Sequence, residues 1–181
     1  MYHKHNTEGI IIGENERGEA SKNVAIFTRE FGLIYASVQN GRALASKLRY
    51  GVQNFSEGSF VLVHGRNSWK LVGAESKRNI WTTLGDREKR RIAANIFSLL
   101  RKMVGEEKNE ELYEIVGSSA ESLQTIELEE AKQLEIRTVL QILKNQGLLV
   151  ENAEDIENLV LDKNKAIKII NESLKASELV V

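Results

Sequence analysis

The chain has 181 residues, of which 41% are hydrophobic and 28% charged, and it contains neither cysteine nor proline. This composition is typical of a globular protein and excludes disordered, collagen-like and rod-like chains. The lack of cysteine excludes disulfides, thiol nucleophiles and thiolate metal centres. The sequence has neither an apolar run long enough to span a membrane nor the apolar stretch of a signal peptide, so we expect a cytoplasmic protein.

The formal net charge of −1 conceals a difference between two parts of the chain. Residues 1–80 carry 11 Lys or Arg against 7 Asp or Glu, whereas residues 81–181 carry 14 against 19. The glycines divide as 9 and 4, and the aromatic residues as 8 and 3. Because these shifts coincide, we predict two domains of different secondary structure, residues 1–80 and residues 81–181.

Stretches rich in β-branched and aromatic residues, separated by turns that contain glycine, predict five strands in the first domain. They cover residues 7–14, 24–28, 33–38, 60–64 and 68–72. The last two flank a short turn and are expected to form a hairpin. Five short strands in fewer than 80 residues favour a small antiparallel barrel or sandwich.

The second domain has the apolar periodicity of helices. Ile92, Ile96 and Leu100 recur every four residues after a capping candidate at Asp86. Gly147 stands where a left-handed C-terminal cap belongs. Further helices are predicted over residues 112–126, 128–146 and 162–174, the last capped by Asp162. We therefore expect a helical bundle after the barrel.

Templates for catalysis find no match in the sequence. Residues 41–48 partly resemble a P-loop, but Ser46 replaces the second glycine and Leu48 replaces the hydroxyl residue that binds Mg²⁺. The two histidines near the N-terminus are not expected to fix a metal, and His64 beside a turn is expected to be an exposed residue at the end of a strand. Most carboxylates lie on predicted helix faces, where charge is solvated. We expect no catalytic residue, no metal and no cofactor, and hence no enzyme.

The basic and aromatic residues of the first domain suggest a different chemistry. Residues 31–56 contain no acidic side chain. Single-stranded nucleic acid binds where Lys and Arg pair with phosphates and aromatic rings stack on bases. The candidate stacking rings are Tyr35, Tyr50 and Trp69, whereas the phenylalanines at 27, 31, 55 and 60 are expected in the core.

Several short motifs occur together and in order in the first domain. They are Thr7-Glu8-Gly9-Ile10-Ile11-Ile12, Gly18-Glu19-Ala20-Ser21-Lys22, Ile26-Phe27-Thr28-Arg29-Glu30-Phe31-Gly32, Gly41-Arg42, Ser46-Lys47-Leu48-Arg49, Gln53-Asn54-Phe55-Ser56 and Trp69-Lys70-Leu71. As an ensemble they resemble the N-terminal domain of the RecO recombination mediators over roughly residues 7–80. Further along, Leu134-Glu135-Ile136-Arg137 and Lys144-Asn145-Gln146-Gly147-Leu148 resemble that family's central helix and its end.

The resemblance implies an OB-fold followed by an α-helical domain. It also implies a DNA repair and recombination mediator that binds single- and double-stranded DNA and anneals complementary strands. Such a mediator works with RecR and single-stranded-DNA-binding protein to load the RecA recombinase, in the bacterial cytoplasm at the nucleoid. The implied phosphate contacts are Lys22, Arg42, Lys47, Arg49 and Lys70, with Arg29 and Arg66 as further candidates.

The sequence departs from the family pattern at several positions. Leu33 and Gln39 stand where basic residues are common, and the basic run before Ser46 is reduced to Arg42. Many members carry a four-cysteine zinc module, so a chain without cysteine is expected to be a short, zinc-less member. A proline common beside Phe55 is absent, so we expect a more mobile loop over residues 41–54.

Two other functions are compatible with these residues. The acidic, aliphatic second domain favours a protein–protein adaptor that keeps the RecO-like fold and docks RecR or the single-stranded-DNA-binding protein, with little DNA binding of its own. A third hypothesis treats residues 136–150 as a recognition helix and wing, in which only Arg137 and Lys144 are basic.

Overall fold

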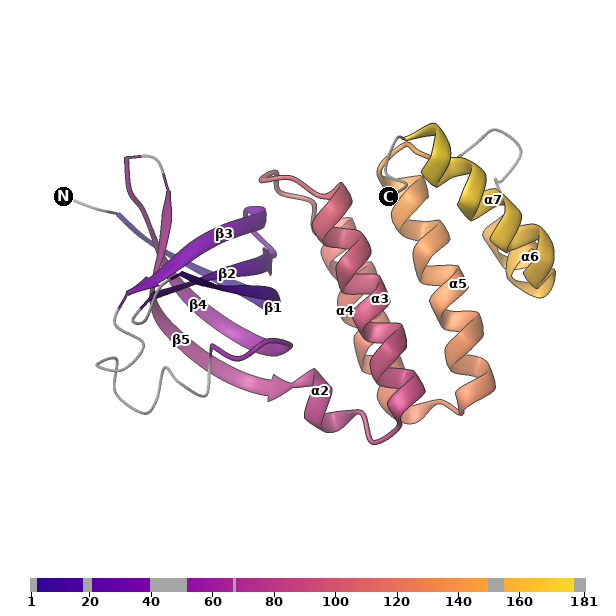
Figure 1. Ribbon diagram of the computed structural model, residues 1–181, viewed down its shortest axis with the longest axis horizontal. Coiled ribbons are helices and arrows are strands. Elements are labelled where there is room, and N and C mark those ends of the chain that lie inside the picture. The colour runs from indigo at the N-terminus through magenta and orange to yellow at the C-terminus, as the bar shows by residue number, and fades with distance from the viewer. Residues whose placement is uncertain (1–2, 18–20, 40–51, 67, 150–154, 178–181) are drawn as a thin grey trace. The chain divides into compact units, whose positions relative to one another are not determined.

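The computed structural model describes residues 3–17, 21–39, 52–66, 68–149 and 155–177. The chain divides into two compact units. The first comprises residues 1–83 and 104–113, and the second comprises residues 84–103 and 114–181. The first unit contains the strands, drawn from indigo to magenta in Figure 1, and the second contains most of the helical residues.

The strands of the first unit form a closed barrel in the order β1-β2-β3-β5-β4. Their bounds are β1 (Lys4–Arg17), β2 (Ser21–Thr28), β3 (Gly32–Gln39), β4 (Ser56–His64) and β5 (Trp69–Asn79). This strand order is that of the OB-fold, so the expected fold is confirmed. The predicted hairpin of β4 and β5 is also present, with His64 opposite Trp69. One pairing is not antiparallel as expected, because β3 and β5 run parallel through Ala36–Trp69 and Ser37–Lys70.

The strands extend beyond the ranges that the sequence pattern predicts, and β1 and β5 show this most clearly. β1 begins at Lys4 instead of residue 7, and β5 continues to Asn79 instead of ending at residue 72. The second half of β5 pairs Glu75 with Ser59 and Arg78 with Glu57. Charged side chains on the outside of this part of the barrel hide the alternation of apolar residues from which a strand is normally recognised.

The barrel core is formed by the inward-facing alternate residues of all five strands. Phe27 and Phe60 are fully buried as predicted, whereas Phe31 and Phe55 are only half-buried. Each fully buried side chain of this size stabilises the fold by roughly 1.5–3 kcal/mol. The central cluster consists of Ile11, Val24, Ile26, Ile34, Ala36, Val38, Val52, Phe60, Leu62, Trp69 and Leu71.

The helices begin and end at the residues that cap them. The elements are α2 (Ile80–Thr83), which continues from β5 in the first unit, α3 (Arg87–Met103), α4 (Glu110–Thr125), α5 (Leu128–Asn145), α6 (Ile156–Leu161) and α7 (Lys163–Ala176). The Oδ1 of Asp86 accepts a hydrogen bond of 2.7 Å from the amide of Glu88, and the Oδ1 of Asp162 accepts one of 3.1 Å from the amide of Lys165. Gly147 has φ +68° after α5. All three predicted end signals are therefore confirmed.

The helical unit packs around α5. The predicted apolar positions Ile92, Ile96 and Leu100 of α3 are buried. Leu140 of α5 packs with apolar residues of α6 and α7, which lie beside α5 in Figure 1. The short helix α6 was not predicted, because its six residues are fewer than the two turns that a helical period needs to be visible.

The segment of residues 104–113, which joins α3 to α4 and includes the first turn of α4, packs onto the barrel. The amide of Leu33 donates a hydrogen bond of 2.9 Å to the carbonyl of Gly105. The edge of β3 is paired with β5 only at its C-terminal half, so Gly105 gives the N-terminal half a backbone partner. The ring of Tyr113 lies 5.7 Å from that of Phe27, between centroids. This segment is therefore counted with the barrel although it follows α3 in the sequence.

Candidate nucleic-acid interface

A row of outward-facing residues crosses the barrel from β1 to β3. Lys4 of β1 is opposite Val63 of β4, Val63 is opposite Lys70 of β5, and Lys70 is opposite Ser37 of β3. Register partners project to the same face of a sheet. Their chain neighbours, such as Trp69, are buried, so this row faces outward. The Cα atoms of Lys4 and Lys70 are roughly 10 Å apart, because one strand separates them.

Tyr35 is the most exposed aromatic side chain in the described part of the chain. It lies on the outer face of β3, one outward position from Ser37, and 52% of its surface is exposed. Its register partner on β2 is Ala25, which is itself buried. A ring held on a strand and open to water is suited to stacking on a nucleobase. Of the predicted stacking residues, Tyr35 has the required exposure.

The cations of this outer face have no carboxylate partner among the described residues. Lys4 and Lys70 are exposed at the ends of the row, and Arg66 is exposed in the turn between β4 and β5. None of the three makes an ion pair with a described carboxylate. In OB-folds this turn and the face of the second and third strands form the ligand-binding surface. Three cations and one open ring therefore lie on or beside the part of the barrel that binds ligands in this fold.

Two of the predicted phosphate contacts are engaged inside the barrel unit. The Nζ of Lys22 donates to the Oε2 of Glu14 at 2.9 Å and to the carbonyl of Val52 at 2.6 Å. Arg29 forms ion pairs with two carboxylates, those of Glu8 at 3.3 Å and Glu110 at 3.2 Å. Its guanidinium also lies 5.0 Å from the centre of the Tyr113 ring. Both side chains stabilise the fold, and a phosphate would have to compete with these partners.

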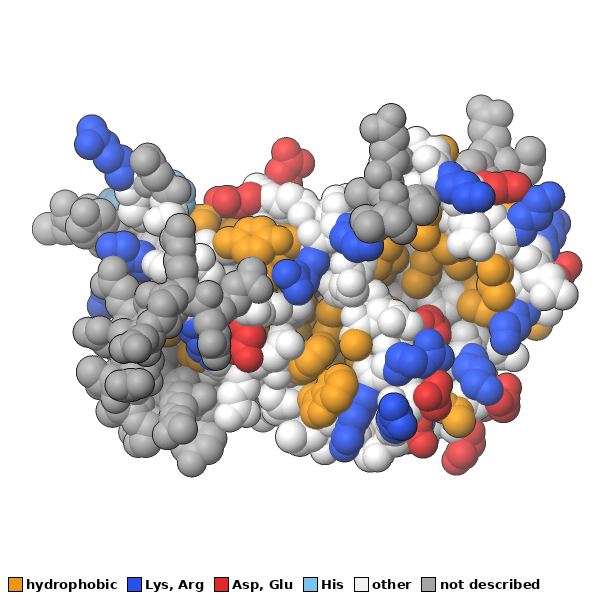
Figure 2. Space-filling view, viewed as in Figure 1, with side chains coloured by type: hydrophobic (Ala, Val, Ile, Leu, Met, Phe, Trp, Pro, Cys, Tyr) orange, Lys and Arg blue, Asp and Glu red, His pale blue; other side chains and the backbone are white. Residues whose placement is uncertain are grey.

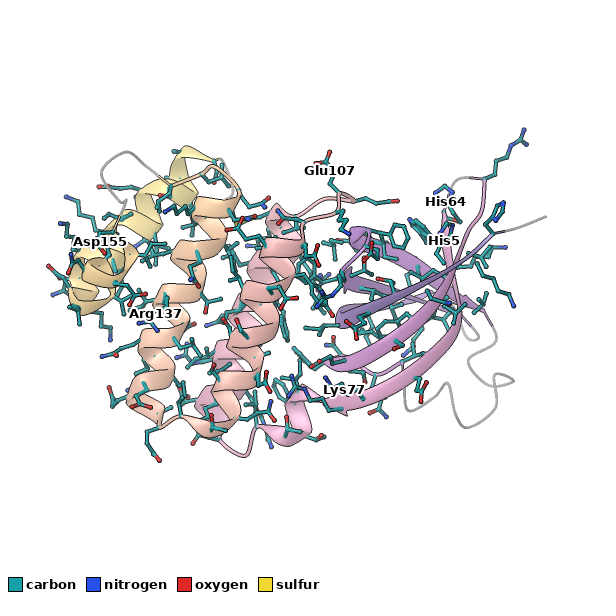
Figure 3. All side chains as sticks on the ribbon, turned by 180° about the vertical axis from the view of Figure 1, so that it is seen from behind. His5, His64, Lys77, Glu107, Arg137 and Asp155 are labelled. Atoms are coloured by element: carbon teal, nitrogen blue, oxygen red, sulfur yellow. The ribbon has the colours of Figure 1, made fainter. Side chains whose placement is uncertain are left out.

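Trp69 differs from the expectation of an open stacking ring. Only 6% of its surface is exposed, because it points inward from β5. The rings of His5, Phe31 and His64 surround it with centroid distances between 4.7 and 5.5 Å. Figure 3 shows both histidines at the same end of the barrel. The expectation that this indole is exposed is therefore corrected: Trp69 belongs to the core.

The remaining predicted residues of the interface lie outside the described residues. They are Arg42, Lys47, Arg49 and Tyr50. Most of the loop expected to be mobile, residues 41–54, lies there as well. These positions stay predictions.

Sequence reasoning missed Lys4. The first residues of β1 are polar, so they lack the apolar alternation from which a strand is recognised. His5 and Thr7 alternate with the exposed residues Lys4 and Asn6, and only the later residues of the strand are apolar. The alternation of His5, Thr7, Gly9 and Ile11 with a period of two was the signal that could have extended the strand to Lys4.

The helical unit presents mixed charge. On the face seen in Figure 2, its Lys and Arg side chains are interspersed with Asp and Glu side chains. Arg137, one of the two cations of the hypothetical recognition helix, forms an ion pair of 2.7 Å with Glu157 of α6. Both side chains come from packed helices, and Figure 3 shows Arg137 on the α5 side. Of the two cations in the hypothetical recognition helix, only Lys144 is therefore left to contact a phosphate.

Among the described residues, no three His, Asp or Glu side chains gather closely enough to hold a metal ion. In the same part of the chain, every helix is too short or too polar to cross a membrane.

Comparison with known proteins shows similarity to one family over the barrel. The family of the recombination protein O N-terminal domain matches residues 1–79. The DNA repair protein RecO of Alkaliphilus metalliredigens is 29% identical over 135 residues, which cover 74% of this chain and 52% of that protein. The protein of the same name from Bacillus velezensis is 32% identical over 117 residues, covering 64% of this chain and 46% of that protein.

A third relative is similar mainly over a shorter stretch. The DNA repair protein RecO of Gloeothece citriformis is 40% identical over 68 residues, which cover 38% of this chain and 24% of that protein. The chain spans about half the length of the first of these relatives. The family match coincides with the barrel, whose strands occupy residues 4–79. Over residues 1–79 the chain is therefore similar to the N-terminal domain of the RecO family.

Proposed function

We propose that this protein is a DNA repair and recombination mediator that binds single- and double-stranded DNA on the outer face of its barrel. The observation that carries the proposal is the row from Lys4 to Lys70, with the open ring of Tyr35 beside it. The names of the relatives, DNA repair protein RecO, support a role in repair. The chain spans about half the length of the first relative.

The proposed mechanism involves no covalent chemistry. Lys4, Lys70 and Arg66 pair with phosphates, and Tyr35 stacks on a base. Binding two complementary strands screens the repulsion between two polyanions and raises their local concentration, which speeds annealing. Arg42, Lys47 and Arg49 are proposed as further phosphate contacts from the sequence. RecR, single-stranded-DNA-binding protein and, indirectly, RecA are the proposed partners in the bacterial cytoplasm.

The test is fluorescence anisotropy of a labelled single-stranded oligonucleotide across a series of salt concentrations. We compare the wild-type chain with the double variant K4Q/K70Q. Each lost phosphate contact lowers the slope of log affinity against log salt by about 0.7 for a single strand, so the double variant should lose about 1.4. The matched control is K165Q, which removes an exposed lysine on α7 and should leave the slope unchanged.

Two results would contradict the proposal. If the wild-type chain does not bind the oligonucleotide at low salt, the protein does not bind DNA as proposed. Equal slopes for the wild-type chain and K4Q/K70Q would place the DNA elsewhere on the protein.

The adaptor function has its own supporting observation. Leu161 at the end of α6 exposes 80% of its surface, and Ile167 of α7 exposes 41%. Exposed aliphatic side chains of this kind can anchor a protein partner. If the adaptor function holds, L161S weakens binding of purified RecR or single-stranded-DNA-binding protein, while DNA affinity stays low in both chains.

A further inference from the structure

The outer face of β1, β4 and β5 carries a second row of residues besides the one from Lys4 to Lys70. Glu8 of β1 is opposite Ser59 of β4, and Ser59 is opposite Glu75 of β5. All three are exposed. Glu8 follows Lys4 by four residues, an even number, so both project to the same side of the strand. We name the two rows the basic row (Lys4, Val63 and Lys70) and the acidic row (Glu8, Ser59 and Glu75).

A bulge in β5 brings both charges of that strand to the same face. Lys70 and Glu75 are five residues apart, and the side chains of a regular strand alternate, so this odd spacing would place them on opposite faces. The register between β4 and β5 shifts between Val61 and Leu62, which makes Val72 an additional residue. The bulge therefore restores the outward direction of Glu75.

The surface between the two rows is largely apolar. It is formed by Asn6 of β1, Val61 of β4 and Val72 of β5. Val72 exposes 42% of its surface, and Val61 is half-buried. The next residue of β5 is Gly73, where a Cβ would lie 3.0 Å from the Cγ2 of Val61. An apolar centre with polar and charged residues around it is the usual composition of a protein–protein interface.

The charges of both rows are largely unpaired within the described part of the chain. Lys4, Lys70 and Glu75 form no ion pair with another described residue. Glu8 lies 3.3 Å from the Nε of Arg29, yet its side chain remains 64% exposed. On β1 the two rows are about 13 Å apart, at roughly 3.3 Å per residue. Opposite charges are thus held apart on one face, and a matching surface would need them in the reverse order.

We propose that this face binds a second copy of the same chain, face to face, about a two-fold axis that runs between the rows and across the strands. Such an axis reverses the strand direction, so the basic row of one copy lies over the acidic row of the other. On β1, Lys4 meets Glu8 of the second copy, and Glu8 meets its Lys4. On β5, Lys70 and Glu75 pair in the same way. Val61 and Val72 pack around the axis.

Symmetry alone gives the second copy the pattern that the face requires. A nucleic acid would be attracted by the basic row but repelled by the acidic row, so it does not fit the whole face. The face spans three strands and about five residues of each, roughly 14 by 16 Å, which is well below the area of about 800 Å² that each partner buries in a standard interface. We therefore expect a weak dimer that is lost at high salt.

The experiment is sedimentation velocity of the full chain at about 100 µM, in about 50 mM and about 0.5 M NaCl. The wild-type chain should contain dimer at low salt and be monomeric at high salt. E8K/E75K makes both rows basic, and K4E/K70E makes both acidic, so each variant alone should raise the dimer dissociation constant more than about tenfold. The control E121K/E172K makes the same change of net charge as E8K/E75K on exposed residues of α4 and α7 and should keep the dimer.

Mixing the two variants gives a test that loss of the Glu8–Arg29 ion pair cannot imitate. The rows of E8K/E75K and K4E/K70E attract each other, so an equimolar mixture should regain the dimer, whereas K4E/K70E mixed with E121K/E172K should not. Circular dichroism of each variant verifies its fold before mixing. Saturating oligothymidylate should dissociate the wild-type dimer, because the basic row serves both partners.

Three results would overturn the inference: a wild-type chain that is monomeric at low salt, a dimer that E8K/E75K does not weaken, or a mixture of the two folded variants that stays monomeric. The proposed DNA binding is decided separately, by the salt slope of K4Q/K70Q. A monomeric chain with a lowered slope in K4Q/K70Q would remove the dimer and leave the DNA contact. A dimer in a chain that binds no oligonucleotide would do the reverse.

Discussion

The indole nitrogen of Trp69 donates a hydrogen bond of 2.6 Å to the Oε1 of Glu106, which lies 37 residues further along the chain. The donor belongs to a ring in the barrel core, and the acceptor belongs to the segment between α3 and α4. A buried indole N–H needs an acceptor, since leaving it unpaired costs free energy. Glu106 therefore couples the core of the barrel to a segment that lies outside the strands.

Replacing Glu106 should destabilise the protein measurably. E106A removes the acceptor and should lower the free energy of unfolding by about 1.5 kcal/mol, because hydrogen bonds to charged groups are stronger than neutral ones. E106Q keeps a neutral acceptor and should lose less. The measurement is urea unfolding followed by tryptophan fluorescence. The control is E107A, an exposed neighbour in the same segment, which should change stability by less than about 0.5 kcal/mol. Equal effects of E106A and E107A would show that the hydrogen bond contributes nothing.

Gly32 is expected to tolerate no side chain. Its φ is +66°, and a Cβ would lie 2.3 Å from the carbonyl oxygen of Glu107 and 2.6 Å from that of Gly105. G32A should therefore cost about 3 kcal/mol or more, through backbone strain and displacement of the packed segment. The matched control is G117A in α4, where nothing lies within 4 Å of the added carbon.

Removing glycine from a helix interior should stabilise the protein, so G117A is expected to raise the free energy of unfolding by about 0.5–1 kcal/mol. Thermal unfolding of the two variants gives opposite shifts of the midpoint if this reasoning holds. A G32A chain as stable as the wild type would mean that the segment of residues 105–107 is not packed against β3.

A buried pair of hydroxyl groups joins α4 and α5. The Oγ of Ser119 and the Oγ1 of Thr138 are 2.8 Å apart, and both residues are buried. S119A or T138V alone leaves one hydroxyl without this partner and should cost about 1 kcal/mol. The double variant should cost less than the sum, with a coupling of about 0.5 kcal/mol or more. Denaturant unfolding of the four chains measures it, and strict additivity would contradict the hydrogen bond.

Arg29 should affect stability more than DNA binding. Its ion pairs with Glu8 and Glu110 and its position over Tyr113 are lost in R29Q. Since the side chain is 31% exposed, the expected loss is modest, about 0.5–1 kcal/mol. The salt dependence of oligonucleotide binding should stay unchanged. A slope that falls by about 0.7 would instead identify Arg29 as a phosphate contact, as the family resemblance implies.

The sequence predicted the elements whose signals are local. The caps at Asp86 and Asp162, the left-handed Gly147 and the hairpin of β4 and β5 follow from residue types at fixed positions. The parallel pairing of β3 with β5 does not, because register between distant strands is set by packing.

The site was predicted less completely than the fold. Basic and aromatic residues can be counted in a sequence, but the partner of each side chain cannot. Lys22 and Arg29 are held by carboxylates and carbonyls of other elements, and Trp69 is turned inward by its place on β5. Lys4 lies on the outer face of the barrel because the polar start of the chain forms the first residues of β1. Exposure and pairing therefore decide which charges are free, and both arise from contacts between distant segments.

The contact of Leu33 with Gly105 has a consequence for the order in which the protein is made. On the ribosome, all five strands are synthesised before α3, yet the N-terminal half of β3 then still lacks its backbone partner. The acceptor for Trp69 is made later still. Chains fold progressively as they emerge, and contacts between distant residues form late. We therefore expect the barrel of a nascent chain to be completed only after the segment that follows α3 has been synthesised. In a chain stalled within α3, the N-terminal half of β3 would lack its backbone partner.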